Sequence, residues 1–580
     1  MDIFPIAICS IIFERDDLMS RIKPFDYIII GAGTAGGVIA KKLTDDRRTS
    51  VLVLEAGTNM TEELSSPSGA VSSALASDNR HSLNILSKVE PTIGRQLLLS
   101  NGRAIGGSSE HNAMLAVRCS SNLFDEWAKL VGFQWSYKNV RPLFIKNETY
   151  TGETQEPKER GTDGPIFVRQ QLIPENGLTT ILARATSDVL DIPIVEDYNT
   201  GIRDCTFFKS QYTQEEVEGG FIRSSTATGY LNEHIVTQGN EFNPDEIGIG
   251  RRKLAILAKS TVNKIIFIEN AGIPLARTVE FVRDGKAQRA SARKGIIVCA
   301  GNMSPVILQR SGIGKSEDLA KAGIKTIVES PNVGHNLQTH YAVGIGIEVE
   351  TSRLQRVMEK DPDQPIPIGA FKKEDGPRNH SGRRLQLLGN IGPRFVPGPD
   401  ITINKWEFNP DNPTNVMSIG IVDLNPASKG TILAAHSDPE ALPSVAFNPL
   451  ENPDDLNYMI DRYIDTFEIM KRARELDPDG VYRVVYPSET IFHLRDEQEK
   501  RARLADFARA SYTALNHYGG QCRMGNTIKE GVVDGFLNVF GTRNLKVADL
   551  SIAPIMPDGN TVLPCQMIGL NAVRFIQADI

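Results

Sequence analysis

The residues best suited to bind a dinucleotide lie between residues 26 and 57. Gly31, Gly33 and Gly36 have the spacing G-x-G-x-x-G, and Glu55 ends the next apolar run. In this motif the first glycine allows a tight turn, the second lets the backbone approach a pyrophosphate, and the third lets a helix pack against a strand. A carboxylate at the position of Glu55 accepts hydrogen bonds from a ribose. The spacing therefore predicts a dinucleotide site, and an ordinary glycine loop is the less favoured interpretation.

The hydrophobic pattern predicts the elements that position these residues. Residues 26–30 and 51–54 are apolar runs of strand length, and residues 36–43 between them have the composition of a helix. Strand, glycine turn, helix and strand in this order form a βαβ unit. Residues 254–267 alternate and predict one further strand, and residues 295–301 predict another that leads into a helix.

Length and composition favour a large protein of two connected domains. The chain has 580 residues, more than the ~250–300 at which single cores divide. Its net charge of −7 gives no electrostatic basis for binding nucleic acid. No stretch has the ~18–20 apolar residues of a membrane span, and residues 3–13 are interpreted as packed structure because they lack the features of a signal peptide.

The cysteines indicate neither a disulfide framework nor a metal site. None of the six is in C-x-x-C spacing, which favours reduced, mostly buried thiols and a cytoplasmic protein without a metal. The six are Cys9, Cys119, Cys205, Cys299, Cys522 and Cys565.

Several motifs in a fixed order resemble one family, the glucose-methanol-choline (GMC) flavoprotein oxidoreductases. Those motifs are FDYIIIGAGTAGGVIA from residue 25, GRAIGGSSEHN from 102, IIVCAGNMSPVILQRSGIG from 296, PNVGHNLQTH from 331, HYGGQCRMG from 517 and LKVADLSIAP from 545. The resemblance covers nearly the whole chain and is weakest at residues 345–507. Thr339 and Gln521 depart from the family pattern, which usually has aspartate and threonine there.

The resemblance implies an α/β fold with two domains. Residues 22–335 and 508–580 would form a Rossmann-type FAD-binding domain. Residues 336–507 would form an α+β substrate domain on a mainly antiparallel sheet. The charged run at residues 495–503 alternates in sign at helical spacing and predicts a solvated helix face.

The resemblance also implies the reaction, oxidation of an alcohol CH–OH group by hydride transfer to the N5 atom of FAD. Such a reaction needs a base for the hydroxyl proton and a polar group that holds the oxygen. The matching positions are His517, whose side-chain type titrates near neutrality, and Asn560. His335 and His340 are interpreted as packing and support residues.

Further FAD contacts are implied by the matched motifs. The Val262 backbone would meet the adenine, whereas Asp549, the Asn560 backbone and the N-terminus of a helix at residues 563–578 would face the flavin. His111 either bonds covalently to the flavin 8α-carbon or only hydrogen-bonds near it, and Glu110 replaces the usual small residue beside it. The remaining implied contacts are Thr34, Ala35, Ala56, Arg103, Gly106, Gly107, Ser108, Asn112, Ala113, Met114, Leu115, Thr561 and Val562.

Two alternative functions remain open on the same fold. One is a non-redox flavoprotein, either a hydroxynitrile lyase or a fatty acid photodecarboxylase, which no residue specifically supports. The other is a non-catalytic FAD-binding structural protein, against which the presence of both His517 and Asn560 argues.

The expected partners are an alcohol and oxygen or another electron acceptor, and a homodimer is compatible with the sequence. The substrate domain has proline-rich loops at residues 361–367 and 393–400. No carboxylate there is recognisable as an anchor for a quaternary ammonium, so choline is not favoured over another primary alcohol.

Overall fold

The computed structural model describes residues 24–59, 79–173, 177–218, 220–232, 235, 252–361, 366–373, 382–391 and 416–578. The segment at residues 3–13 and the proline-rich loop at residues 393–400 lie outside this part of the chain.

The first large sheet carries the glycine motif. Its strand order is β11-β2-β1-β14-β13-β12, and β26 also pairs with β14. The strands are β1 (Phe25–Ile30), β2 (Val51–Leu54), β11 (Leu254–Leu257), β12 (Ser260–Asn270), β13 (Ile273–Arg283), β14 (Lys286–Val298) and β26 (Leu545–Val547). β1 runs parallel to both β2 and β14, with Ile28 opposite Leu52 and Ile296. These residues are fully buried, as expected for parallel strands covered on both faces.

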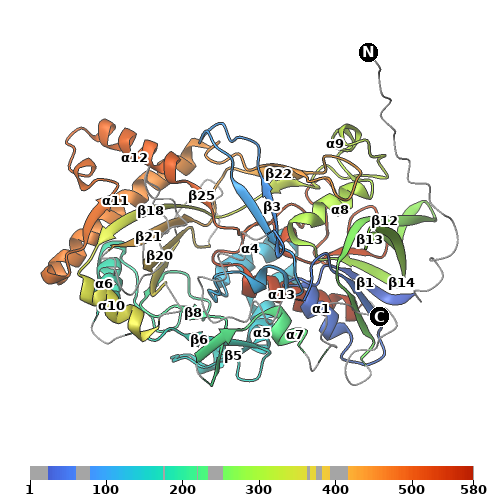
Figure 1. Cartoon of the computed structure of the whole chain (residues 1–580), viewed down its shortest axis with the longest axis horizontal. Coiled ribbons are helices and arrows are strands. Elements are labelled where there is room, and N and C mark those ends of the chain that lie inside the picture. Colours follow the sequence, from blue (N-terminus) through green and yellow to red (C-terminus); the bar gives the residue numbers. More distant parts are fainter. Residues whose placement is uncertain are drawn as a thin grey trace, which may run out of the picture.

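Two predictions about this region need correction at their boundaries. Residues 254–267 do not form one strand, because Lys259 has φ +54° and separates β11 from β12. The last helix, α13 (Val562–Ala578), begins one residue earlier than predicted. α13 packs against α1 (Gly36–Leu43), so the two ends of the described chain lie side by side (Figure 1).

The second large sheet is antiparallel. Its strand order is β24-β18-β21-β20-β19-β7, and β25 also pairs with β18. The strands are β7 (Cys205–Phe207), β18 (Tyr341–Glu348), β19 (Ile368–Lys372), β20 (Leu385–Ile391), β21 (Val416–Asp423), β24 (Arg483–Tyr486) and β25 (Thr513–Ala514). β7 and β25 thus join this sheet from outside residues 336–507.

Other helices and smaller sheets cover the two large sheets. The helices are α4 (Ser121–Val131), α5 (Tyr137–Asn147), α6 (Leu178–Leu190), α7 (Thr226–Tyr230), α8 (Ser304–Arg310), α9 (Ser316–Lys321), α10 (Thr351–Lys360), α11 (Pro453–Leu476) and α12 (Glu497–Ser511). The two-stranded sheets pair β3 (Ser82–Leu86) with β4 (Leu98–Gly102), β9 (Gln214–Val217) with β10 (Gly220–Arg223), and β15 (Ile313–Gly314) with β16 (Val328–Glu329). In one three-stranded sheet, β6 (Ile166–Gln170) lies between β5 (Glu148–Tyr150) and β8 (Gln211–Tyr212). In the other, β22 (Gly430–Leu433) lies between β17 (His335–Leu337) and β23 (Ser444–Ala446).

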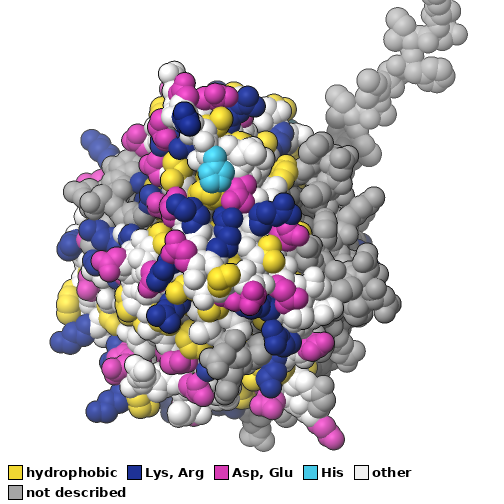
Figure 2. All heavy atoms as spheres, turned by 90° about the vertical axis from the view of Figure 1, so that its left-hand side faces the viewer, with side chains coloured by type: hydrophobic (Ala, Val, Ile, Leu, Met, Phe, Trp, Pro, Cys, Tyr) yellow, Lys and Arg dark blue, Asp and Glu magenta, His cyan; other side chains and the backbone are white. Residues whose placement is uncertain are grey.

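The charged run at residues 495–503 lies mostly on α12, as the sequence predicts. Lys500 pairs with Glu497, and Arg503 pairs with Glu499. Figure 2 shows the side of the molecule on which α11 and α12 lie, where acidic and basic side chains are interspersed. Within the described residues, no helix is both long and apolar enough to cross a membrane.

Candidate active site

A cavity of about 880 Å³ is lined by residues from both large sheets and brings most of the predicted site residues together. This is within the usual range for ligand pockets. The predicted residues in its wall are Gly31, Gly33, Thr34, Ala35, Glu55, Ala56, Arg103, Gly107, Ser108, His111, Asn112, Ala113, Met114, Leu115, Val262, His517, Asp549, Asn560, Thr561 and Val562. Gly36 and Gly106 are the two predicted residues outside the lining.

The three glycines of the motif have different physical roles. Gly31 has φ +100°, and a Cβ there would lie 2.5 Å from the Cys299 carbonyl oxygen. A Cβ on Gly36 would collide with the Gly31 carbonyl oxygen. Gly33, in contrast, has room for a Cβ, whose nearest neighbour would be the Gly107 Cα at 3.8 Å. The fold therefore requires Gly31 and Gly36, whereas Gly33 keeps the cavity open for a group that approaches the backbone.

Two buried carboxylates shape the loops around the cavity. Glu55 accepts hydrogen bonds from the backbone N–H groups of Ala32 and Gly57, both at 2.8 Å. Asp549 accepts from the Gly301 N–H at 2.9 Å and from the Ser304 hydroxyl at 2.5 Å. Burial raises the pKa of both carboxyl groups, and these hydrogen bonds oppose the shift. Each carboxylate thus fixes a turn whose backbone faces the cavity.

Arg223 holds the loop at residues 106–115. Its guanidinium donates to the Asn112 side-chain oxygen at 2.6 Å and to the Asn112 carbonyl at 2.8 Å. The same side-chain oxygen accepts from the Met114 N–H at 3.0 Å, and Met114 has φ +60°. The clamp therefore stabilises a backbone conformation that non-glycine residues rarely adopt.

His111 lies in this loop and faces the cavity. Its Nε2 is 3.4 Å from the Ser82 hydroxyl. Burial, with a smaller contribution from Arg223, lowers the pKa of His111 to about 4, so the ring is neutral near pH 7. A neutral ring nitrogen is what covalent attachment of a flavin requires.

His517 and Asn560 meet at the wall of the cavity. The Asn560 Nδ2 lies 3.3 Å from the His517 Nε2. The His517 Nδ1 lies 2.9 Å from the Nδ1 of His340, so one of these nitrogens donates and the other accepts. The sequence interpretation gave His340 only a packing or support role and did not identify this contact, although His340 belongs to a matched motif. His335, in contrast, pairs with Asp318 at 2.9 Å.

Burial keeps both rings of this pair uncharged. It lowers the pKa of His517 to about 4 and lowers the pKa of His340 well below its usual value. His517 therefore has a lone pair available at neutral pH, which is the state that a general base needs.

Sequence reasoning also missed several apolar residues of the wall. Met303 and Ile307 lie within the matched motif that begins at residue 296, whereas the others lie in segments without motifs, namely Leu83, Leu98, Ile366, Leu388, Leu442 and Leu515. The positions of this second group depend on how distant segments pair, so no local signal marks them. Gln386, beside Leu388 in β20, was missed too, and it donates to the Asn560 side-chain oxygen at 3.0 Å.

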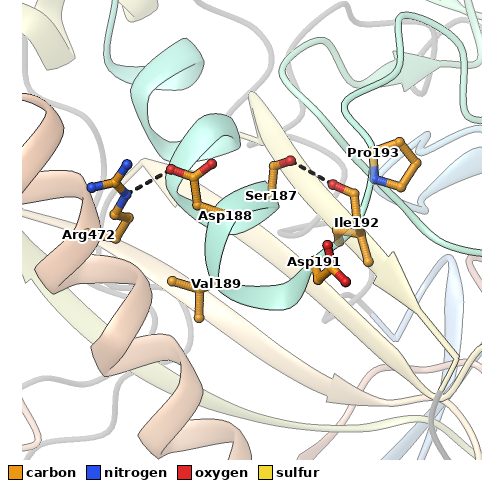
Figure 3. A pocket seen from close by; sticks show the side chains of 7 residues that line it. All are labelled: Ser187, Asp188, Val189, Asp191, Ile192, Pro193 and Arg472. Carbon is orange, nitrogen blue, oxygen red and sulfur yellow. Dashed lines mark hydrogen bonds and ion pairs between the residues drawn. The ribbon is translucent and has the colours of Figure 1, made fainter.

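A second, open hollow lies at the C-terminal end of α6 and shares no residue with the main cavity. Figure 3 shows its lining, in which Arg472 of α11 pairs with Asp188 at 2.8 Å and Ser187 donates to the Ile192 carbonyl. Its charged groups are already paired or exposed, so this hollow has no arrangement that indicates chemistry.

The residues around the main cavity fit FAD. The open space over Gly33, the buried Glu55 at the end of β2 and the N-terminus of α1 are the parts from which a dinucleotide site is built. Thr561 and Val562, at the N-terminus of α13, and the loop from Asn112 to Leu115 line the same cavity.

Comparison with known proteins identifies the family. Residues 25–342 and 426–569 match the N- and C-terminal family models described as GMC oxidoreductase. Oxygen-dependent choline dehydrogenase 1 of Chromohalobacter salexigens is 30% identical over 572 residues, which cover 95% of this chain and 94% of the relative. A GMC-type oxidoreductase of Mycobacterium bovis is 28% identical over 579 residues, covering 95% of this chain and 99% of the relative.

Solved structures share the fold. Pyridoxine 4-oxidase from Mesorbium loti has a TM-score of 0.75 at 23% identity, covering 95% of this chain and 98% of that one. A formate oxidase variant from Aspergillus oryzae, studied for FAD modification, has a TM-score of 0.78 at 20% identity. The match covers 96% of this chain and 98% of that one. The predicted family, fold class and FAD cofactor are confirmed. The chain belongs to the GMC family of FAD-dependent oxidoreductases.

Proposed function

We propose that this enzyme oxidises the CH–OH group of a primary alcohol to the carbonyl, with His517 as the general base. The observation that carries the proposal is the pair formed by His517 Nε2 and Asn560 Nδ2, 3.3 Å apart in the wall of the cavity that also holds the glycine loop. A substrate hydroxyl that lies against both groups from the cavity side can give its proton to His517 and accept a hydrogen bond from Asn560.

The roles of the two side chains follow from their chemistry. The neutral His517 takes the hydroxyl proton at Nε2, and the Asn560 amide donates to the oxygen on which negative charge develops. FAD, when bound, supplies the acceptor for the hydride that leaves the substrate carbon. Oxygen or another electron acceptor then completes the cycle.

The described lining favours a neutral alcohol over choline. Three acidic side chains lie in it. Glu55 and Asp549 are hydrogen-bonded to the backbone, and Glu440 is exposed. Among the described residues that line the cavity with His517 and Asn560, Ile366, Leu388 and Leu515 offer apolar contacts instead of an anionic site for an ammonium group. Choline and its uncharged analogue 3,3-dimethylbutan-1-ol therefore form a matched pair, and we expect the analogue to react faster.

Anaerobic mixing with a panel of alcohols tests the reaction. An alcohol substrate bleaches the visible flavin absorbance, and His517→Ala should slow that bleaching by about 10²–10⁴-fold while retaining FAD. A hydroxynitrile lyase or photodecarboxylase would leave the flavin oxidised in the dark, and a structural FAD-binding protein would leave it oxidised under every condition. Equal bleaching rates for parent and His517→Ala would assign the base elsewhere.

The proposal includes the predicted domain boundaries, with residues 22–335 and 508–580 binding FAD and residues 336–507 binding the alcohol. It also includes a cytoplasmic location and a homodimer, which cell fractionation and light scattering would test.

A further inference from the structure

Four polar side chains, those of His340, His517, Asn560 and Gln386, are joined by hydrogen bonds. The series ends at Gln386, which lies at the centre of the antiparallel sheet. Gln386 is 1% exposed and is held in β20 between Val422 of β21 and Phe371 of β19. Its Nε2 donates to the Asn560 Oδ1 at 3.0 Å, whereas its Oε1 is buried without a hydrogen-bond partner among the described residues. Gln386 therefore reaches the reaction centre from a rigid strand and does not line the cavity itself.

The direction of this hydrogen bond determines which end of the Asn560 amide faces His517. A primary amide accepts at its oxygen and donates at its nitrogen. Because the oxygen accepts from Gln386, the Nδ2 is the end that lies 3.3 Å from the His517 Nε2. An NH₂ group can only donate, so this arrangement requires a lone pair on that Nε2.

The same reasoning extends to His340. With Nε2 unprotonated, a neutral His517 carries its proton on Nδ1 and donates it to the His340 Nδ1, 2.9 Å away. If every hydrogen bond in this series ran in the opposite direction, the Asn560 oxygen would face a protonated Nε2 of His517. His517 would then be the wrong tautomer to remove a proton from the substrate.

We propose that Gln386 is a positioning residue that orients the Asn560 amide and thereby keeps the Nε2 of His517 unprotonated. The inference rests on the proposed function, since it explains how His517 is held ready as a base. A role in packing alone predicts that any side chain of similar shape would serve.

Gln386→Glu distinguishes the two explanations because the change preserves shape and alters hydrogen-bonding capacity. At low pH the protonated carboxyl can still donate to the Asn560 oxygen. Once ionised, the carboxylate only accepts, so the Asn560 NH₂ turns toward it and the oxygen turns toward His517. Burial raises the pKa of such a carboxyl, so this transition falls above the ordinary range of glutamate.

The tautomer of His517 is the primary measurement, because it does not depend on knowing the alcohol. Long-range ¹H–¹⁵N correlation spectra of the ¹⁵N-histidine-labelled holoenzyme, assigned with His517→Gln, should show an unprotonated Nε2 in the parent. Gln386→Glu should show the same state at low pH and a protonated Nε2 at high pH. Gln386→Leu, which leaves the amide unoriented, should show both tautomers.

Asn390→Asp is the matched control. Asn390 lies on the same face of β20, is fully buried, and bonds to the Leu388 carbonyl instead of Asn560. A carboxyl there should leave the tautomer unchanged. An unchanged tautomer in both Gln386 variants, or the same change in Asn390→Asp, would overturn the inference.

Flavin reduction by the best alcohol of the panel gives a second measurement. The rate for Gln386→Glu should match the parent at low pH and fall about 10²-fold or more as the carboxyl ionises, as expected when a catalytic histidine takes the wrong tautomer. A rate that does not vary with pH relative to the parent would contradict the inference. If no alcohol reduces the flavin, the proposed function fails, and the tautomer spectra still decide the role of Gln386.

Discussion

Gly33→Ala should separate the requirements of the cofactor from those of the fold. A methyl group at this position would lie 3.8 Å from the Gly107 Cα and meet nothing closer. The apoprotein should therefore be as stable as the parent or more stable by about 0.4–1 kcal/mol, since alanine restricts the unfolded chain. FAD, however, would have to share with a methyl group the space that Gly33 leaves open.

The expected loss of affinity follows from the cost of crowding a packed contact. Inserting a methyl group into such a contact costs about 1–3 kcal/mol, which corresponds to roughly 5- to 150-fold weaker FAD binding. Gly36→Ala should instead destabilise the apoprotein, because its Cβ would collide with the Gly31 carbonyl oxygen. Gly295→Ala is the neutral control, since its Cβ would make ordinary contacts at 3.4–3.5 Å outside the cavity.

Fluorescence titration of the apoproteins with FAD gives the affinities, and thermal unfolding without FAD gives the stabilities. A His111→Ala background keeps the cofactor exchangeable in every variant. The reasoning is refuted if Gly33→Ala binds FAD as tightly as the parent, or if its apoprotein unfolds as early as that of Gly36→Ala.

Two further predictions concern buried titratable groups beside the cavity. The neutral His111 ring lines the cavity and so meets the requirement for a covalent bond to FAD, which acid precipitation tests: a yellow pellet from the parent that turns colourless in His111→Ala establishes the bond, and a yellow supernatant from the parent excludes it. Burial raises the pKa of Glu110 from 4.5 to about 7, so the folded protein holds the carboxyl proton more tightly than the unfolded chain does. The contribution of this proton to the free energy of unfolding is complete below pH 4.5 and is lost as the pH rises through about 7. The pKa shift corresponds to about 3 kcal/mol in the free energy of unfolding. Because glutamine does not ionise, the thermal midpoint of Glu110→Gln should fall less than that of the parent between about pH 5 and pH 8. An unchanged pH dependence would show that Glu110 ionises freely in the folded protein.

The local features of the FAD-binding domain could be predicted from the sequence because short-range patterns specify them. The apolar run before Gly31 and the run that ends at Glu55 became β1 and β2, paired in parallel. The strand predicted at residues 254–267 was wrong in one respect, since nothing in its alternating pattern marks the turn at Lys259.

The partners of His517 and Asn560 depend on long-range pairing that the sequence does not show. Pairing of β25 with β18 brings the segment before His517 against Tyr341, the residue after His340. Gln386 reaches Asn560 from a strand 174 positions earlier. Contacts of this kind follow from sheet topology, which no local motif in the sequence reveals.

The pairing of β26 with β14 also has a consequence for the order of events during synthesis. Where these strands meet, Cys299 bonds to the Ala548 carbonyl across 249 positions. At 5–20 residues per second, a ribosome needs roughly 10–50 s to make the intervening chain. During that time β14 is paired in parallel only with β1, and β26, the strand that leads to Asp549, does not yet exist. The nascent chain therefore cannot assemble a complete cofactor site until α13 emerges, so FAD capture follows the synthesis of that helix, and until β26 forms the unpaired side of β14 is open to pairing with a wrong strand.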